Sequence, residues 1–216
     1  MTTPRSIADF HNTRWSLVAA LREPQHGQAR LDELCIRYWV PVQACFADRG
    51  FEPEAAMRMT RGFFDHLVRE GIARASEYGR FRLFLLDELE RYVALTQATQ
   101  SDAAHVEHDE QTLRQQFAIE VIAQAMRRLR IEASEAGRQA VFERLQHYLS
   151  NEGSKAEHDR DAAALGVHPL FIVMAVRRLR QRFRQLVDEE LAEITRSSDD
   201  YLAEREAMRE ALERAP

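Results

Sequence analysis

Five arginines lie within eight residues, and their side chains are the best suited in this sequence to bind phosphate. They are Arg177, Arg178, Arg180, Arg182 and Arg184. A guanidinium group donates several N–H bonds in a planar fork that matches phosphate oxygens and base edges. The cluster therefore predicts a nucleic-acid contact. Arginines also gather at helix ends because positive charge is favoured there, so a solvated helix face is the alternative interpretation.

The residues before the cluster predict the helix-turn-helix that would position it. Ala162 and Ala163 are small enough for two helices to cross closely, and Gly166 tolerates the positive φ of a tight turn. Val167 then supplies an apolar anchor after the turn. The apolar face of the second helix follows a helical period through Ile172, Val176, Leu179 and Phe183. An ordinary helical hairpin is the alternative.

Charge is segregated along the chain. The 216 residues carry a net charge of −5, which by itself argues against a protein dedicated to nucleic acid. Residues 188–214, however, contain 10 acidic and 4 basic residues, and residues 101–113 contain 4 acidic residues and no Arg or Lys. Of the 30 basic residues only Lys155 is a lysine, which a GC-rich genome explains.

Few glycines and prolines, and no alternating apolar runs, predict an all-α fold of two small helical domains joined by a linker. Apolar spacing predicts helices over residues 13–22, 29–49, 52–70 and 80–97, in an N-terminal domain of residues 1–98. An acidic linker is expected over residues 99–113. Further helices are expected over residues 117–129, 137–149, 159–165 and 169–194, with a C-terminal domain of residues 114–190.

The acidic segment of residues 191–216 predicts a helical extension with a break near Ser197 and Ser198. Its negative charge follows the arginine cluster directly in the sequence. It is therefore expected either to shield those arginines, as an autoinhibitory segment, or to remain a solvated helix. The solvated helix is the favoured interpretation.

Four stretches, in this order, resemble extracytoplasmic-function (ECF) sigma factors over about four-fifths of the chain. The first is the predicted helix at Leu31–Gly50, which contains Tyr38, Trp39 and Pro41. The others are Thr60–Leu67 (TRGFFDHL), Gly79–Arg82 (GRFR) with Phe84 and Leu85, and the helix-turn-helix ending at Arg180. Each stretch is loose alone, and their joint order makes the resemblance specific.

The resemblance implies a bacterial transcription initiation factor that binds core RNA polymerase and promoter DNA. The N-terminal domain would bind the β′ coiled coil of polymerase and open the −10 element, and the C-terminal domain would read the −35 element and touch the polymerase flap. The implied polymerase-binding residues are Met57, Arg58, Thr60, Arg61 and Asp65. The implied DNA-binding residues are Arg80, Arg82, Arg91, His168, Arg177, Arg178, Arg180 and Arg182.

The chain departs from the family at positions 57 and 58, where the family carries acidic residues. Met57 and Arg58 stand there, and Arg61 follows one turn later, so the local charge is about +2. Because the family's partner surface on polymerase is basic, like charges would weaken and slow the association. The sequence therefore predicts weak binding to polymerase.

Thr60 lies between those two arginines. A phosphothreonine carries about −1.5 to −2 charges at neutral pH, which would bring this surface to about zero. The resulting hypothesis is that a Ser/Thr protein kinase activates the factor at Thr60, and a kinase-linked group of ECF sigma factors has this kind of substitution. The alternative is that Thr60 is an ordinary helix residue, half-buried beside Phe64.

The start of the predicted recognition helix is also unusual. Residues 170–174 (LFIVM) are apolar, where polar side chains would normally read bases. Together with the missing acids, this favours an alternative function: a sigma-like regulatory or adaptor protein that acts through protein contacts, without productive polymerase binding.

No enzyme, cofactor or metal site is expected. The sequence has no Gly-rich phosphate loop, no Cys-x-x-Cys pair and no nucleophile motif. His105 and His108 are spaced for a metal, but a solvated loop is the favoured interpretation there. No apolar run approaches the ~20 residues of a membrane span, and no signal peptide is visible. We therefore expect a cytoplasmic protein without a membrane partner.

Overall fold

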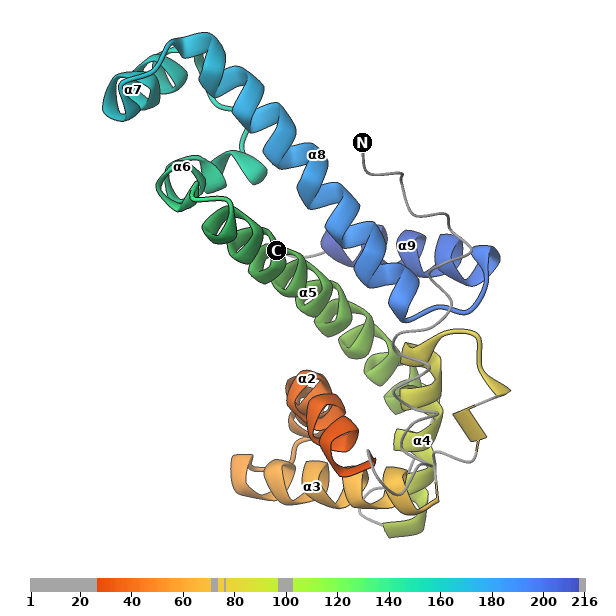
Figure 1. The fold of residues 1–216 in the computed structure, drawn as a ribbon. Helices are drawn as coiled ribbons and strands as arrows, with labels where there is room; N and C mark the ends of the chain where they lie inside the picture. Colours follow the sequence, from red (N-terminus) through yellow and green to blue (C-terminus); the bar gives the residue numbers. More distant parts are fainter. Residues whose placement is uncertain (1–26, 71–73, 76, 97–102, 214–216) are drawn as a thin grey trace. The chain divides into compact units, whose positions relative to one another are not determined.

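The computed structural model describes residues 27–70, 74–75, 77–96 and 103–213, with side chains left undescribed for 27–35 and 103–108. Every regular element in these residues is a helix (Figure 1). One isolated antiparallel bridge joins Arg80 to Thr195. The prediction of an all-α fold is confirmed for this part of the chain. The helix predicted over residues 13–22 lies outside the described residues.

The chain divides into two compact units. Unit 1 combines residues 1–120 with residues 191–216, and unit 2 comprises residues 121–190. The first boundary falls inside a helix and not in a linker. The predicted separate extension of residues 191–216 is wrong in this respect, because these residues belong to the same unit as the N-terminal helices.

Unit 1 contains three of the helices that the apolar spacing predicts, α2 (Gly27–Asp48), α3 (Pro53–Arg69) and α4 (Phe81–Thr96). Pro53 opens α3, where its missing N–H has no helical partner to lose. The core of the unit is rich in aromatic rings. Tyr38 lies with its ring centroid 4.8 Å from that of Phe81 and 5.0 Å from that of Phe117.

The predicted acidic linker is wrong from residue 103 onward, because α5 runs from Ala103 to Glu135. Its apolar residues recur at helical spacing at Leu113, Phe117, Val121, Ala125 and Leu129, all of which are buried. The acidic residues of the segment obscured this pattern. One of them, Asp109, is buried and accepts a hydrogen bond from Arg49 Nε at 2.9 Å.

The backbone at His105 and His108 is helical, so the loop predicted there is wrong. The side chains of both histidines lie outside the described residues. Among the described side chains, no group of three or more His, Cys, Asp or Glu residues is placed to hold a metal ion.

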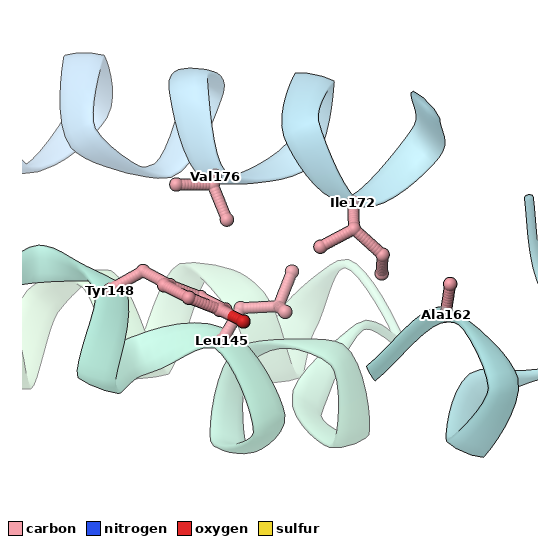
Figure 2. Packing of buried hydrophobic residues seen from close by; sticks show 5 residues of the cluster. All are labelled: Leu145, Tyr148, Ala162, Ile172 and Val176. Carbon is pink, nitrogen blue, oxygen red and sulfur yellow. The ribbon is translucent and has the colours of Figure 1, made fainter. Parts of the chain in front are cut away.

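Unit 2 consists of the end of α5, α6 (Gln139–Leu145), the short 3-10 helix η3 (Gln146–Leu149), α7 (Lys155–Leu165) and most of α8 (Pro169–Glu193). Two hydrophobic clusters hold these elements together. One contains Leu145, Tyr148, Ala162, Ile172 and Val176 (Figure 2). The other contains Ala125, Leu129, Phe142 and Leu186.

The chain after α8 returns to unit 1 and ends in α9 (Ser198–Glu213). The break predicted near Ser197 and Ser198 is confirmed. Ser197 forms the turn before the helix, where its hydroxyl accepts a hydrogen bond from the backbone N–H of Asp200 at 3.1 Å. This is the bond that a serine commonly provides at a helix N-terminus.

No single helix in the described residues is long and apolar enough to cross a membrane. The consecutive helices α7 and α8 meet that criterion only when they are counted together, and they are bent by 103° at the break between them.

Candidate functional site

The predicted helix-turn-helix segment corresponds to α7, a short turn and the start of α8. Ser154 and Glu157 form a capping box that starts α7. Gly166 ends the helix with φ +65°, the left-handed conformation that glycine adopts at least cost. The backbone N–H of Val167 then donates to the carbonyl of Ala162 at 3.0 Å, which closes the turn. The 103° bend between the helices follows from this turn.

The apolar face of α8 packs where the spacing predicts. Ile172 and Val176 are buried against Leu145 and Tyr148, with Ala162 of α7 beside them (Figure 2). Leu179 and Phe183 continue the same face and are half-buried. The predicted close approach at Ala162 is confirmed, whereas Ala163 is exposed.

A buried polar contact ties η3 and α6 to α7. The hydroxyl of Tyr148 donates to Asp161 Oδ2 at 2.7 Å, and Arg144 Nε donates to Asp161 Oδ1 at 2.6 Å. Burial alone would raise the pKa of Asp161, but these two hydrogen bonds hold that pKa below its usual value. Burial and the adjacent carboxylate raise the pKa of Tyr148 to about 12. The pair therefore stays as phenol and carboxylate across the physiological range.

The five clustered arginines divide into two groups. Arg177, Arg178 and Arg184 are exposed. Arg180 instead donates to the backbone carbonyl of Tyr148 at 2.9 Å, and Arg182 donates from Nε to Glu132 Oε2 at 2.8 Å. Only the exposed three are available to a ligand in this conformation.

Arg182 is held by a second carboxylate, that of Glu189 at 3.2 Å from its Nη1. The bonds to Glu132 lower the pKa of that glutamate and raise the pKa of Arg182. Arg180 and Arg182 therefore stabilise unit 2. As free DNA-binding residues they are corrected, since neither sequence neighbours nor helical period revealed their partners.

The start of α8 presents apolar side chains to the surface. Leu170 is 60 % exposed, and Phe171, Val173 and Met174 are each nearly half exposed. His168 is also exposed, and its Nδ1 accepts a hydrogen bond from the backbone N–H of Leu170 at 3.2 Å. The imidazole thus caps the helix start, and its Nε2 edge is the one left to face a ligand.

The arginines of the predicted strand-binding surface lie in unit 1, and one of them is enclosed. Arg82 is 1 % exposed and donates from Nε to Glu204 Oε1 of α9 at 2.8 Å. Arg80 is partly exposed, with Nη1 3.9 Å from the same carboxylate. Arg91 is exposed and pairs with Asp87 one turn earlier on α4, at 2.8 Å. The prediction of a free Arg82 is therefore corrected.

Four of the five predicted polymerase-binding residues share the surface of α3. They are Met57, Arg58, Arg61 and Asp65, all exposed. The fifth, Thr60, is 0 % exposed, and its hydroxyl donates to the carbonyl of Ala56 at 2.8 Å. Its position one turn after Ala56 and one turn before Phe64 puts it on the buried face. The prediction that Thr60 lies on the charged surface is wrong in this conformation.

The residues that sequence reasoning missed are the carboxylates that engage these arginines. Glu204, Glu132 and Asp161 lie 122, 50 and 17 positions from the arginines they bind. Asp161 precedes the small residues Ala162 and Ala163 on α7, and nothing in that pattern marks it as buried. Only a comparison of positions that vary together across relatives would have signalled such distant pairs.

Comparisons of the chain with known protein families, with curated proteins and with solved structures give no match.

Proposed function

We propose that the chain is a DNA-binding transcription initiation factor of the sigma type, with α7 and α8 as its helix-turn-helix. The observation that carries this proposal is the 103° bend at the left-handed Gly166, followed by a helix with exposed arginines. Helix-turn-helix motifs join two helices at about 90–120° through a short turn that often contains glycine.

The exposed face of α8 has the chemistry of a DNA contact. Arg177, Arg178 and Arg184 project from a helix whose opposite face is buried against unit 2. At about 1.5 Å per residue, Arg177 and Arg184 lie roughly 10 Å apart along the helix axis. That span suits phosphates that flank a groove, and each neutralised phosphate adds a salt-dependent increment to the affinity.

Sigma-type function, as opposed to simple DNA binding, is supported by unit 1. The three stretches that resemble sigma factors before the helix-turn-helix fall on α2, on α3 and at the start of α4. The surface of α3 that carries Met57, Arg58, Arg61 and Asp65 is the part of unit 1 that would contact polymerase. Its two arginines keep the expectation of weak polymerase binding in force.

Phosphorylation of Thr60 stays a hypothesis and requires α3 to open. The hydroxyl is enclosed and bonded to the helix backbone, so a kinase would meet it only after the first turns of α3 unwind. Local opening of a helix near a unit's surface is an ordinary event with a free energy below that of global unfolding.

A second candidate function rests on the exposed apolar side chains Leu170, Phe171, Val173 and Met174. Contiguous exposed apolar side chains commonly mark protein interaction sites. On this view the chain is a sigma-like adaptor whose α8 binds a protein. The same residues would contact thymine methyl groups if α8 enters the major groove.

The test measures binding of the purified chain to mixed-sequence duplex DNA by fluorescence anisotropy across a salt series. We expect the Arg177→Gln/Arg178→Gln variant to weaken binding and to lower the slope of log K against log salt by about 2. The matched control is Arg127→Gln/Arg209→Gln, which removes the same charge from exposed positions outside α8. Equal effects of the two variants would reject α8 as the DNA-binding helix.

Polymerase dependence separates the two candidates. A sigma factor should direct run-off transcription when it is added to core polymerase, and Met57→Glu/Arg58→Asp should raise its affinity for core. An adaptor would bind neither partner productively, and Leu170→Ser/Val173→Ser would leave its DNA and polymerase binding unchanged.

A further inference from the structure

The segment before α4 in unit 1 is covered by the chain that follows α8. The backbone N–H of Phe81 donates to the carbonyl of Ile194 at 3.0 Å, and that of Arg196 donates to the carbonyl of Gly79 at 3.0 Å. These bonds flank the bridge between Arg80 and Thr195. Gly79 has no room for a side chain, because a Cβ there would overlap the carboxylate of Asp200. The start of α9 is thereby fixed over residues 79–82.

Glu204 of α9 occupies the arginines of that segment. Its two oxygens accept hydrogen bonds from Nε and Nη2 of Arg82, at 2.8 and 3.3 Å, and Arg80 Nη1 lies 3.9 Å from Oε2. Paired N–H donors of arginine bind carboxylate and phosphate in the same forked geometry. The Glu204 carboxylate therefore stands where a phosphate with the same partners would bind.

The match between Glu204 and Arg82 is incomplete. Arg82 Nη1 is buried and has no hydrogen-bond partner among the described residues. The oxygen of Glu110 lies 3.6 Å from it, too far for a hydrogen bond. A buried donor without an acceptor is costly, and a phosphate offers more acceptor oxygens than one carboxylate. A nucleic-acid backbone would satisfy this site better than α9 does.

The rest of α9 is weakly attached. Of its 16 residues, only Glu204, Ala207 and Ala211 are buried. Alanine side chains bury little apolar area, and Leu202 and Leu212 are exposed. The other described tie is an ion pair between Arg114 and Glu210 at 3.1 Å, both partly exposed. A helix held in this way can detach without unfolding the aromatic core of unit 1.

We propose that α9 is an autoinhibitory helix whose Glu204 occupies a binding site for the phosphates of single-stranded DNA at Arg80 and Arg82. Binding of a strand to unit 1 then requires release of α9. This inference rests on the proposed function, which assigns those arginines to a DNA strand. It also replaces the expectation that the acidic extension shields the arginine cluster of α8, since Glu204 and Glu210 bind arginines of α4 and α5.

The first experiment compares two variants of α9 in the full chain. A fluorescein-labelled 20-nucleotide oligo(dT) is titrated and anisotropy is recorded. We expect Glu204→Gln to lower the Kd at least fivefold, because the competing carboxylate loses its charge. The matched control is Glu206→Gln, an equal charge change on the same helix at an exposed residue that faces Arg209. We expect the control to change the Kd less than twofold.

A third variant assigns the gain to Arg82. Adding Arg82→Gln to Glu204→Gln should abolish the increase in affinity, whereas adding Arg205→Gln, an exposed arginine of α9, should preserve most of it. Equal affinities of the Glu204→Gln and Glu206→Gln chains would overturn the proposal. So would the absence of oligo(dT) binding by a folded Glu204→Gln chain.

A second measurement uses the unaltered chain, so it does not depend on the folding of a variant. Hydrogen exchange is followed in peptides covering residues 198–213, with and without saturating oligo(dT). Release of α9 predicts faster exchange there when the strand is bound, and unchanged or slower exchange would overturn the proposal. Duplex binding through Arg177 and Arg178 is measured separately. If it persists while α9 does not respond, autoinhibition fails and the proposed function stands; if duplex binding alone is lost, the proposed function fails.

Discussion

The arginines of α4 and those of α8 differ in what surrounds them. Arg82 is enclosed by Glu204 and lies almost wholly out of solvent, whereas Arg177 and Arg178 stand exposed on a helix face. Both sets come from basic stretches that the sequence assigns to DNA. The difference lies in acidic residues elsewhere in the chain, which close one surface and leave the other open.

The comparison teaches that an arginine's position in a motif does not reveal whether it is free. Arg180 and Arg182 sit among exposed neighbours on α8, yet each holds a partner in unit 2. The arginines that face solvent are the ones whose charge is available for long-range attraction to DNA. The enclosed ones stabilise the fold until something displaces their partners.

The largest expected effect comes from removing the enclosed arginine. Arg82→Ala leaves the carboxylate of Glu204 buried without its main partner, which should lower the free energy of unfolding by about 4 kcal/mol. Urea unfolding followed by circular dichroism measures it. Replacing both residues, as Arg82→Leu/Glu204→Leu, should recover most of that loss. If Arg82→Ala costs no more than Arg177→Ala, the contrast between enclosed and open arginines is wrong.

Thr60 tests whether α3 is as closed around its hydroxyl as α9 is around Arg82. Thr60→Glu places a carboxylate where the side chain is buried, and we expect a loss of about 3 kcal/mol in unfolding free energy. Thr60→Val removes only the hydrogen bond to Ala56 and should cost about 1 kcal/mol or less. Thermal unfolding of both variants gives the answer. A Thr60→Glu chain as stable as the parent would show that α3 opens readily and would support phosphorylation there.

Asp161 offers the corresponding test inside unit 2. Its pKa is lowered in the folded chain, so it stabilises the fold at neutral pH, and this contribution is lost as pH falls below 4 through the lowered pKa. Asp161→Asn should therefore cost about 2 kcal/mol at pH 7 and progressively less toward pH 3. Urea midpoints measured between pH 3 and pH 7 follow the difference. A constant difference across that range would contradict the assigned ionisation.

The smallest expected effect on stability comes from the open arginines. Arg177→Ala/Arg178→Ala should change the unfolding free energy by less than about 0.5 kcal/mol per residue, because both side chains face solvent. The same protein should lose duplex DNA binding. A thermal scan and an anisotropy titration of one preparation compare the two properties directly. A large loss of stability would mean that these arginines also have structural partners.

Most of the helical architecture follows from local rules. The apolar repeats of α2, α3, α4 and α8 give helices within a few residues of their observed bounds, and Gly166 marks the turn before α8. These features depend on neighbours three or four positions away, so a sequence contains them directly. The same holds for the face of α8 that carries Ile172 and Val176.

The remainder depends on distant partners. The start of α5 has an acidic composition typical of a linker, and it is helical because Leu113 is buried and Asp109 is bound by Arg49. The assignment of α9 to unit 1 depends on Glu204, which no local pattern links to Arg82. Burial of Thr60 depended on which face of α3 meets the core, and the charged neighbours on both sides pointed to the wrong one.

The split composition of unit 1 also sets an order of events on the ribosome. Arg82 emerges 122 residues before Glu204, and at about 5–20 residues per second that interval is roughly 6–24 seconds. Throughout it, the nascent helices α2–α4 lack the carboxylate that encloses Arg82 and the amide that binds Gly79. Unit 1 is therefore completed only after the whole of unit 2 has been synthesised. A chain whose translation stops early would display an uncovered guanidinium to the nucleic acids and chaperones around it.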